Sequence, residues 1–139
     1  MTFTYAHRVR SYEVDHQGIV FNGRYLELAD AAMTEFFDGF GWTYPQLIAL
    51  GFDPAVVAID LRFRAPARLG DDLVVTVTCT HVGTTSTVLH FVVRRGEHDL
   101  ASITTTYVNV TSGVGRSAPI PQPIRERLVA IAQHQGESS

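Results

Sequence analysis

The stretch that decides the fold is Tyr12–Phe37, YEVDHQGIVFNGRYLELADAAMTEFF, an acidic loop that leads directly into a long helix. From Tyr25 onward the apolar residues follow the i, i+3, i+4, i+7 spacing, which places them along one side of an α-helix. These residues are Tyr25, Leu28, Ala29, Ala32, Met33 and Phe36. Because such a stripe must be buried, the rest of the chain has to supply a surface that covers it.

The loop before this helix combines residue types that suit acyl transfer. Asp15 offers a carboxylate, Gly18 a flexible turn, and Asn22-Gly23 a cap or sharp turn at the helix entry. A helix start has unpaired N–H groups and the positive end of the macrodipole, so it can hold an oxyanion. A carboxylate near such donors can attack a carbonyl or activate water. The same residues are also ordinary turn formers, and an Asp before a helix often only accepts backbone amides.

Length and composition limit the classes of protein to consider. With 139 residues, 45% of them hydrophobic, the chain is expected to form one domain over residues 1–139 with a sizeable core. A net charge of −3 argues against nucleic acid as a partner. The single cysteine, Cys79, lies on the apolar side of an alternating segment, so we expect a core residue in a reducing compartment. Without a leader pattern or a run of about 18 apolar residues, we expect a cytoplasmic protein with no membrane partner.

The rest of the chain changes from helical spacing to alternation. A short second helix or turn is predicted over Trp42–Gly51, where Pro45 suits a first helical turn, and a C-terminal helix is predicted from Ile124, followed by a frayed polar tail over Gln133–Ser139. Strands are expected at residues 3–12, 57–63, 73–80, 89–93 and 100–110. Short turns between the strands indicate an antiparallel meander, which would curl around the long helix. The open edges and outer face of such a sheet favour self-association.

With this order of elements and the loop pattern D-x-x-G-I-V-x-N at Asp15–Asn22, the chain resembles the hotdog-fold acyl-CoA thioesterases, in particular the 4-hydroxybenzoyl-CoA thioesterase family. The resemblance runs from Val9 to about Leu128 and includes the stretch LRFRAPARLGDDL at Leu61–Leu73. It implies an α+β hotdog fold, with a five-stranded antiparallel sheet wrapped around one long helix, plus a C-terminal helix. It also implies hydrolysis of an acyl-CoA or acyl-carrier thioester without a metal or added cofactor, since CoA is part of the substrate. The family implies a homo-oligomer, dimer or tetramer, in which a neighbouring subunit completes each site.

The resemblance also assigns roles to residues. The family's catalytic carboxylate falls on Asp15, as nucleophile or general base, within the loop that contains Gly18, and its oxyanion donor falls on the N–H of Asn22 or Gly23. Asn22 stands where relatives often have an aromatic residue or His, and an amide cannot act as an acid. Substrate contacts are expected from Tyr25, Asp30, Trp42, Arg62, Arg64 and Arg116. Arginine suits the phosphates of CoA, but the turn at residues 83–86 lacks the basic residues that some relatives have, which leaves a carrier-protein thioester open.

Two other functions fit the same fold. One is a non-catalytic module that binds or senses an acyl thioester, which the missing basic turn and Asn22 favour. The other is a hotdog dehydratase, whose chemistry usually relies on a His in the cleft, whereas this loop presents Asp15. His81 and His90 are expected on strands, as outer-face or core residues. The aromatic residues after the helix suit either an aromatic acyl group or a medium aliphatic chain.

Overall fold

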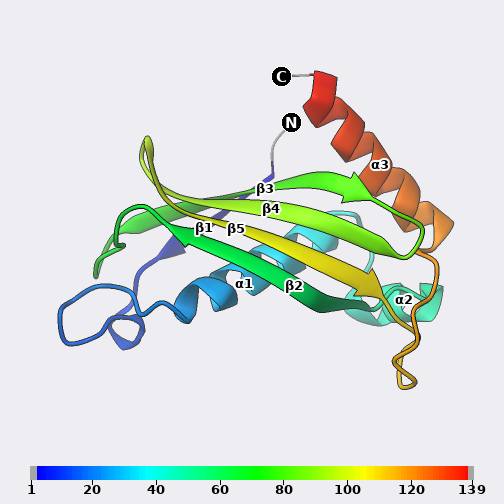
Figure 1. Ribbon diagram of the computed structural model, residues 1–139, viewed down its shortest axis with the longest axis horizontal. Coiled ribbons are helices and arrows are strands. Elements are labelled where there is room, and N and C mark those ends of the chain that lie inside the picture. Colours follow the sequence, from blue (N-terminus) through cyan, green and yellow to red (C-terminus); the bar gives the residue numbers. More distant parts are fainter. Residues whose placement is uncertain (1–2, 138–139) are drawn as a thin grey trace.

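The computed structural model describes residues 3–137, which form one antiparallel sheet and several helices (Figure 1). In chain order the elements are β1 (Phe3–Arg8), the 3₁₀ turn η1 (Ser11–Glu13), α1 (Arg24–Asp38), α2 (Tyr44–Leu50), β2 (Pro54–Phe63), β3 (Asp72–Val82), β4 (Ser86–Arg95), β5 (His98–Asn109) and α3 (Gln122–Glu137). The α+β class and the five strands expected from the sequence are confirmed. The first strand is shorter than expected because η1 turns the chain after Arg8.

The five strands are arranged in the order β1-β3-β4-β5-β2, and every neighbouring pair is antiparallel. The predicted meander is correct for β3, β4 and β5 but wrong for β2, which pairs with β5, while β1 lies beside β3. The eight residues 64–71 make this crossover possible. At roughly 3.3 Å per residue they can span about 26 Å, more than the roughly 14 Å across three strand spacings.

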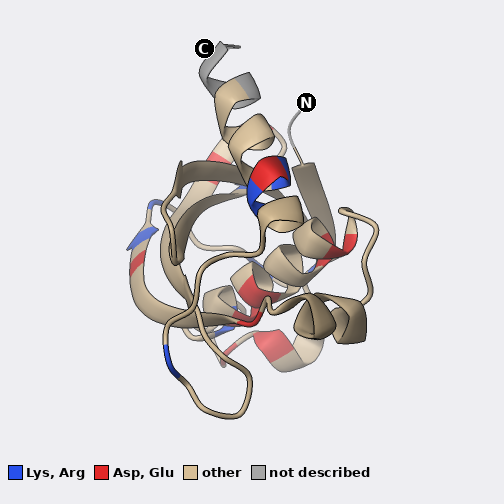
Figure 2. Cartoon of the chain, turned by 90° about the vertical axis from the view of Figure 1, so that its right-hand side faces the viewer, with Lys and Arg blue, Asp and Glu red and all other residues tan. Residues whose placement is uncertain are grey.

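Helix α1 lies in the hollow of the curled sheet, as Figure 2 shows from the end where α2 and α3 lie. The predicted stripe is confirmed, although Met33 is only half-buried and Phe37 joins the buried set. The sheet side of this core is fully buried and consists mainly of Leu73, Val75, Val77, Leu89, Phe91, Val93 and Ile103. Period-two alternation in β3, β4 and β5 therefore supplies the surface that covers the helix.

The two shorter helices close one end of the molecule. Thr43 caps α2 by accepting a hydrogen bond from the Gln46 N–H, and Gly51 ends it with a φ of 94°. In α3, Ile124 and Leu128 are buried, and the helix continues to Glu137, so the polar tail is helical beyond Gln133 and only its last two residues lie outside the described part. No helix within residues 3–137 has both the length and the apolar character needed to cross a membrane.

Strand β2 forms one edge of the sheet and leaves its apolar residues exposed. Val57, Ile59 and Phe63 are 58%, 44% and 47% exposed, although their alternation resembles that of the buried strands. A bulge between Val56 and Ala58 interrupts the register with β5, and no further strand of this chain covers the free edge within residues 3–137. The strand predicted here is present, and Leu61 packs against the core, but much of the apolar surface of the strand stays exposed in the single chain.

Candidate active site

The loop between η1 and α1 is a closed hairpin held by its own backbone. The Asp15 N–H donates to the Ile19 carbonyl at 2.9 Å, and the Gly18 N–H donates to the Asp15 carbonyl at 3.0 Å. Gly18 has a φ of 78°, a conformation that favours glycine and closes the turn. The Val20 N–H donates to the Ala67 carbonyl at 2.8 Å, which fastens the loop to the segment after β2. The sequence therefore builds an ordered loop around Asp15.

The Asp15 carboxylate is half-buried, and one of its oxygens is engaged by this loop. Oδ1 accepts hydrogen bonds from the Gln17 N–H at 2.8 Å and the Ile19 N–H at 3.4 Å. Asp15 therefore does accept backbone amides of its own turn, as an Asp before a helix often does. Oδ2 has no hydrogen-bond partner within residues 3–137. The geometry leaves one carboxylate oxygen for another task.

The start of α1 presents backbone donors without acceptors. Gly23 is the N-cap residue, and no side chain caps the helix there. The N–H groups of Arg24 and Tyr25 donate to the Phe21 and Asn22 carbonyls at 2.9 and 3.3 Å. The N–H groups of Asn22 and Gly23, in contrast, find no acceptor in the described part of the chain. Free amides at the positive end of a helix are suited to bind an oxyanion.

A cavity of about 320 Å³ lies between this helix start and the end of β2. Its lining consists of Ile19, Val20, Asn22, Tyr25, Phe63, Arg64, Ala65 and Pro66. The ring centroids of Tyr25 and Phe63 are 5.1 Å apart in an edge-to-face contact. Burial raises the pKa of the Tyr25 hydroxyl, which accepts a hydrogen bond from the Ala67 N–H at 3.4 Å. The structure thus brings Asn22, Tyr25 and Arg64 to one cavity, whereas Asp15, Gly18 and Gly23 do not line it. That these residues form one site stays a prediction.

A second cavity, of about 300 Å³, lies at the opposite end of β2 and contains two of the four remaining predicted contacts, Asp30 and Trp42. It is lined by Asp30, Met33, Thr34, Phe37, Asp38, Trp42, Tyr44, Leu47, Phe52, Asp53 and Pro54. Aromatic side chains form much of its wall, and Asp30, Asp38 and Asp53 are its charged groups. Within one chain, the predicted substrate contacts are therefore divided between the two ends of β2.

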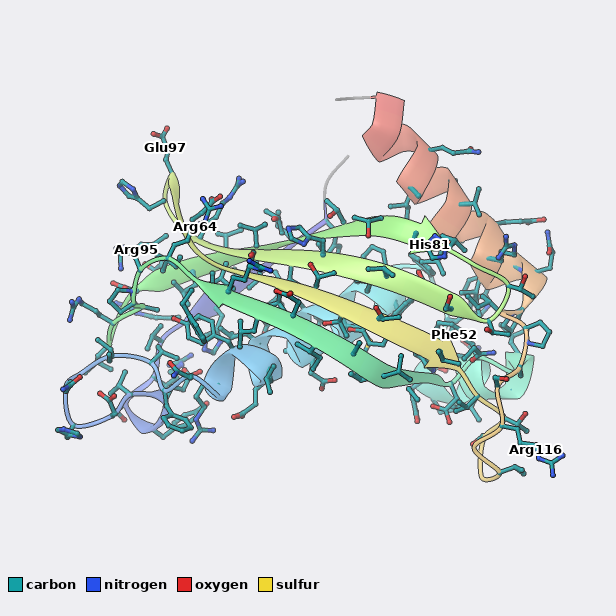
Figure 3. The ribbon with its side chains drawn as sticks, in the orientation of Figure 1. Phe52, Arg64, His81, Arg95, Glu97 and Arg116 are labelled. Carbon is teal, nitrogen blue, oxygen red and sulfur yellow. The ribbon has the colours of Figure 1, made fainter. Side chains whose placement is uncertain are left out.

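The predicted arginines also separate in space. Arg64 lies beside Arg95 at the loop end of the molecule, whereas Arg116 is on the loop after β5 at the other end (Figure 3). Arg62 is exposed and forms an ion pair with Asp60 at 2.9 Å. Of the three arginines, only Arg64 lines the cavity at the start of α1. Arg62 and Arg116 are not brought to that cavity in the single chain.

Sequence reasoning missed a basic hollow next to Arg64. This hollow, of about 730 Å³, shares Arg64 and Ala65 with the first cavity and is lined by Arg64, Ala65, Arg94, Arg95, Gly96, Glu97, His98 and Asp99. Arg94 pairs with Asp99 at 2.7 Å, and Arg95 pairs with Asp71 at 2.8 Å. Burial alone would raise the pKa of Asp71, but its hydrogen bonds with Arg95 and the Arg68 N–H bring the pKa below the usual value. The two adjacent arginines before Gly96 could have indicated this hollow, but that segment was interpreted only as a turn.

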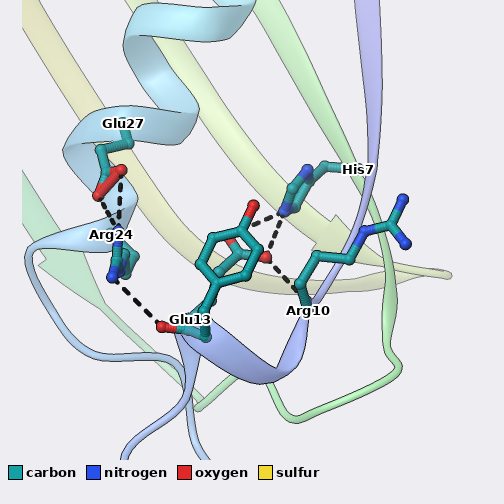
Figure 4. A network of polar contacts seen from close by, with 6 residues as sticks. His7, Arg10, Glu13, Arg24 and Glu27 are labelled. Carbon is teal, nitrogen blue, oxygen red and sulfur yellow. Dashed lines mark hydrogen bonds and ion pairs between the residues drawn. The ribbon is translucent and has the colours of Figure 1, made fainter.

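A second feature that sequence reasoning missed is the buried carboxylate of Glu13, at the base of the loop (Figure 4). Both carboxylate oxygens contact His7 Nε2, at 2.8 and 2.9 Å, and Oε1 also accepts the Arg10 N–H at 2.8 Å. Nearby, the Arg24 side chain pairs with Glu27 at 2.7 Å and donates to the Tyr12 carbonyl at 3.2 Å. No spacing rule links residue 7 to residue 13, so only the turn at η1 reveals this pair.

For metal ions, the described residues contain no group of three or more His, Cys, Asp or Glu placed to act as ligands. His81 is exposed on β3, and His90 contacts Thr104 Oγ1 at 2.9 Å from the half-buried outer side of the sheet. Of the two alternatives predicted for these histidines, outer face or core, the positions agree with the outer face, and neither histidine lines the cavity at the start of α1.

Comparison with known proteins agrees with this architecture. The sequence profile of the Thioesterase superfamily matches residues 17–102, a range that starts two residues after Asp15. A 1,4-dihydroxy-2-naphthoyl-CoA hydrolase from Synechocystis is 27% identical over 125 residues, which are 88% of this chain and 91% of that protein. Another Synechocystis protein, which has an esterase name, is 34% identical over 70 residues. That match covers 50% of this chain and 42% of the relative, so the chain spans less than half of its length.

A solved structure extends the likeness to the whole fold. The crystal structure of a 1,4-dihydroxy-2-naphthoyl-CoA thioesterase from Synechocystis is similar to this chain with a TM-score of 0.82 and 26% sequence identity. The superposition covers 93% of this chain and 96% of that structure. The hotdog fold expected from the sequence is confirmed.

Proposed function

Because the chain belongs to the thioesterase superfamily, we propose that it hydrolyses an acyl-CoA thioester with Asp15 as the catalytic carboxylate and the free amides of Asn22 and Gly23 as the oxyanion hole. Thioester hydrolysis is the chemistry of the family; the residue roles are the proposal. In this reaction the acyl C–S bond breaks, a water oxygen bonds to the acyl carbon, and the thiolate takes up a proton. The products are the free acid and the CoA thiol.

The observation that carries the proposal is the pair of unpaired amides immediately after the Asp15 loop. As the acyl carbonyl becomes tetrahedral its oxygen gains negative charge, and two N–H groups at a helix start stabilise that charge. Asp15 Oδ1 is held by the Gln17 N–H at 2.8 Å, so Oδ2 is the oxygen that attacks the carbonyl or takes a proton from water. Hydroxylamine trapping separates the two routes, because only nucleophilic attack forms an acyl–Asp15 anhydride, which hydroxylamine cleaves to an Asp15 hydroxamate and the free acid.

The second cavity joins the site if two chains pair along their β2 edges. The exposed Val57, Ile59 and Phe63 on a free edge support a homodimer as the basic unit. An antiparallel pairing about a twofold axis puts the Phe63 end of one β2 beside the Pro54 end of the other. The Asp15 loop of one subunit then lies next to the partner's cavity that contains Asp30 and Trp42.

This arrangement suggests which acyl groups fit. A cavity of about 300 Å³ with aromatic walls suits an aryl acyl group, and its carboxylates suit a hydroxyl substituent that can donate a hydrogen bond. The Synechocystis hydrolase and the Synechocystis thioesterase structure are named for a dihydroxylated aromatic acyl-CoA, which supports the same class here. A mixture of Asp15→Asn and Trp42→Ala subunits tests the composite site: hybrid dimers would recover activity that each variant lacks alone.

Arg64 and the basic hollow support CoA rather than a carrier protein as the thiol. The hollow shares Arg64 and Ala65 with the cavity at the start of α1, and the Arg64 side chain has no ion-pair partner within residues 3–137. A phosphorylated nucleotide would meet Arg64 and Arg94 there, in competition with Asp99 for the latter. Arg64→Ala should raise KM for an acyl-CoA but leave the same acyl-pantetheine unaffected, since the latter has no nucleotide.

The experiment that tests the function is thiol release from a panel of benzoyl, hydroxylated aryl and aliphatic CoA esters. We expect Asp15→Asn to remain folded by circular dichroism and to lose about 10³-fold or more in kcat, because the amide neither attacks nor accepts a proton. Full turnover by this variant would contradict the mechanism. Tight calorimetric binding of intact acyl-CoA by the wild type without thiol release would support a sensing module instead.

A further inference from the structure

We propose that Glu13 is a positioning residue that fixes the Asp15 loop against β1, so that the carboxylate and the amides of Asn22 and Gly23 keep their relative places. The inference rests on the proposed function of Asp15. Glu13 is 6% exposed, and its carboxylate accepts from one backbone donor and contacts one side chain. Of these two partners, His7 lies on β1, and Arg10 lies two residues after its end.

The backbone of Glu13 closes the base of the same loop. Its carbonyl accepts the Phe21 N–H at 3.0 Å, and the next residues on each side, Val14 and Val20, form an isolated antiparallel bridge. Asp15 follows Glu13 by two residues, and Asn22 follows Phe21 directly. Both halves of the proposed machinery therefore extend from one junction, and the Glu13 side chain is what ties this junction to the sheet.

The chemistry of the pair explains why a carboxylate is needed. A buried carboxylate is costly unless hydrogen bonds satisfy it, and here the Arg10 N–H and His7 Nε2 do so at 2.8–2.9 Å. A methyl group at position 13 would satisfy neither donor and would leave the base of the loop with its backbone hydrogen bonds and the contact of Arg24 with the Tyr12 carbonyl. Since a displacement near 1 Å can reduce turnover about 100-fold, loss of this tie should act on kcat.

Four variants test the role: Glu13→Ala, Glu13→Gln, His7→Ala and the double variant Glu13→Ala/His7→Ala. Asp72→Asn is the matched control, because it removes another carboxylate that pairs with β1, through Arg8 at 3.9 Å, but one that is exposed. Kinetics with an acyl-CoA are combined with hydrogen exchange of the Gln17, Ile19 and Phe21 amides, measured where each variant is folded.

We expect Glu13→Ala to lower kcat about 10- to 100-fold with KM within about twofold, and to speed exchange at the three loop amides but not in β3 or β4. Glu13→Gln should recover much of the loss, since its amide can still accept the Arg10 N–H and donate to neutral His7. His7→Ala should act in the same direction, and the double variant should lose less than the product of the two single losses.

Other outcomes overturn the inference. Wild-type kcat in folded Glu13→Ala, or unchanged loop exchange in both Glu13 variants, would show that the pair does not position the loop. Should Glu13→Ala fail to fold, Glu13→Gln and His7→Ala decide by the same two measurements. If the wild type and Asp72→Asn release no thiol from any ester, the proposed function fails, whereas the exchange data still decide whether Glu13 holds the loop.

Discussion

At the loop end of the molecule, the N–H groups of Asn22 and Gly23 have no acceptor within residues 3–137, whereas at the α2 end the buried side chain of Asn109 is fully used. Asn109 Oδ1 accepts the Asp53 N–H at 2.7 Å, and Nδ2 donates to the Gly51 and Pro119 carbonyls at 2.9 and 3.0 Å. Asn22 and Gly23 are exposed, so their N–H groups stay available to a substrate, whereas the buried hydrogen bonds of Asn109 stabilise the fold. The loop end therefore offers donors to a substrate, and the α2 end is stabilised by its own hydrogen bonds.

Among the variants that test this difference between the two ends, removal of one free amide should produce the largest effect, a loss of kcat. Gly23 has a φ of −66°, which proline also adopts, so Gly23→Pro would delete the N–H. Proline also restricts the backbone of Asn22 before it, so circular dichroism must show that the variant is folded. Loss of one oxyanion-hole donor typically costs about 10²- to 10³-fold in kcat. Steady-state kinetics of Gly23→Pro and Gly23→Ala measure this, because alanine retains the N–H and its Cβ would meet only the Phe21 ring at 3.3 Å. Equal losses in both variants would mean that the donor is not used.

At the other end, Asn109→Ala should reduce stability rather than turnover. It would leave the Asp53 N–H and two carbonyls without their partner, and we expect the free energy of unfolding to fall by about 3 kcal/mol. Urea titration with unchanged m-value measures this loss. A loss below about 1 kcal/mol would show that water replaces the side chain and that the two ends are less different than proposed.

The buried Tyr107 predicts how stability depends on alkaline pH. Burial raises the pKa of its hydroxyl, so the folded state keeps it neutral where the unfolded state ionises. The stabilisation is complete below the unfolded pKa, near 10, and is lost as pH rises through the folded pKa, by up to about 1.4 kcal/mol per pH unit. Unfolding free energies between about pH 9 and 11 should fall less steeply in Tyr107→Phe; parallel slopes would exclude this residue as the cause.

The smallest effect is expected at Arg127 on α3. Its guanidinium lies over the rings of Phe40 and Trp42, 6.0 and 5.6 Å from their centroids, and Trp42 lines the aromatic cavity. Arg127→Met should destabilise by about 0.5–1 kcal/mol and alter the emission of Trp42, the only tryptophan of the chain. Arg127→Lys should restore the emission, since a cation remains over the ring. An unchanged emission spectrum in Arg127→Met would show that the Arg127 side chain does not contact the Trp42 ring.

The structural features that follow directly from residue spacing were predicted correctly from the sequence. Helical spacing identified the buried face of α1, alternation identified β3, β4 and β5, and the D-x-x-G motif placed Asp15 on an ordered loop before unpaired amides. Alternation could not say which strands pair, because it marks an apolar face without naming the neighbour that covers it. For the same reason β2 was recognised as a strand, but its position at the sheet edge was not.

Side-chain contacts that depend on the crossover or on η1 could not be predicted from the sequence. The turn at η1 brings Glu13 back to His7, and the return of β4 through Gly96 places Arg94 and Arg95 beside Arg64. Such pairs have no fixed spacing, so only the assembled backbone reveals them. The separation of Arg116 from Arg64 has the same cause, since the two lie at opposite ends of the molecule.

The exposed edge of β2 also bears on how the folded state responds to concentration. If a second copy covers Val57, Ile59 and Phe63, association and folding are linked by mass action, and the thermal midpoint will rise as the protein is concentrated. Dilution would then weaken the enzyme without any change in its sequence, and midpoints measured at different concentrations would not be comparable.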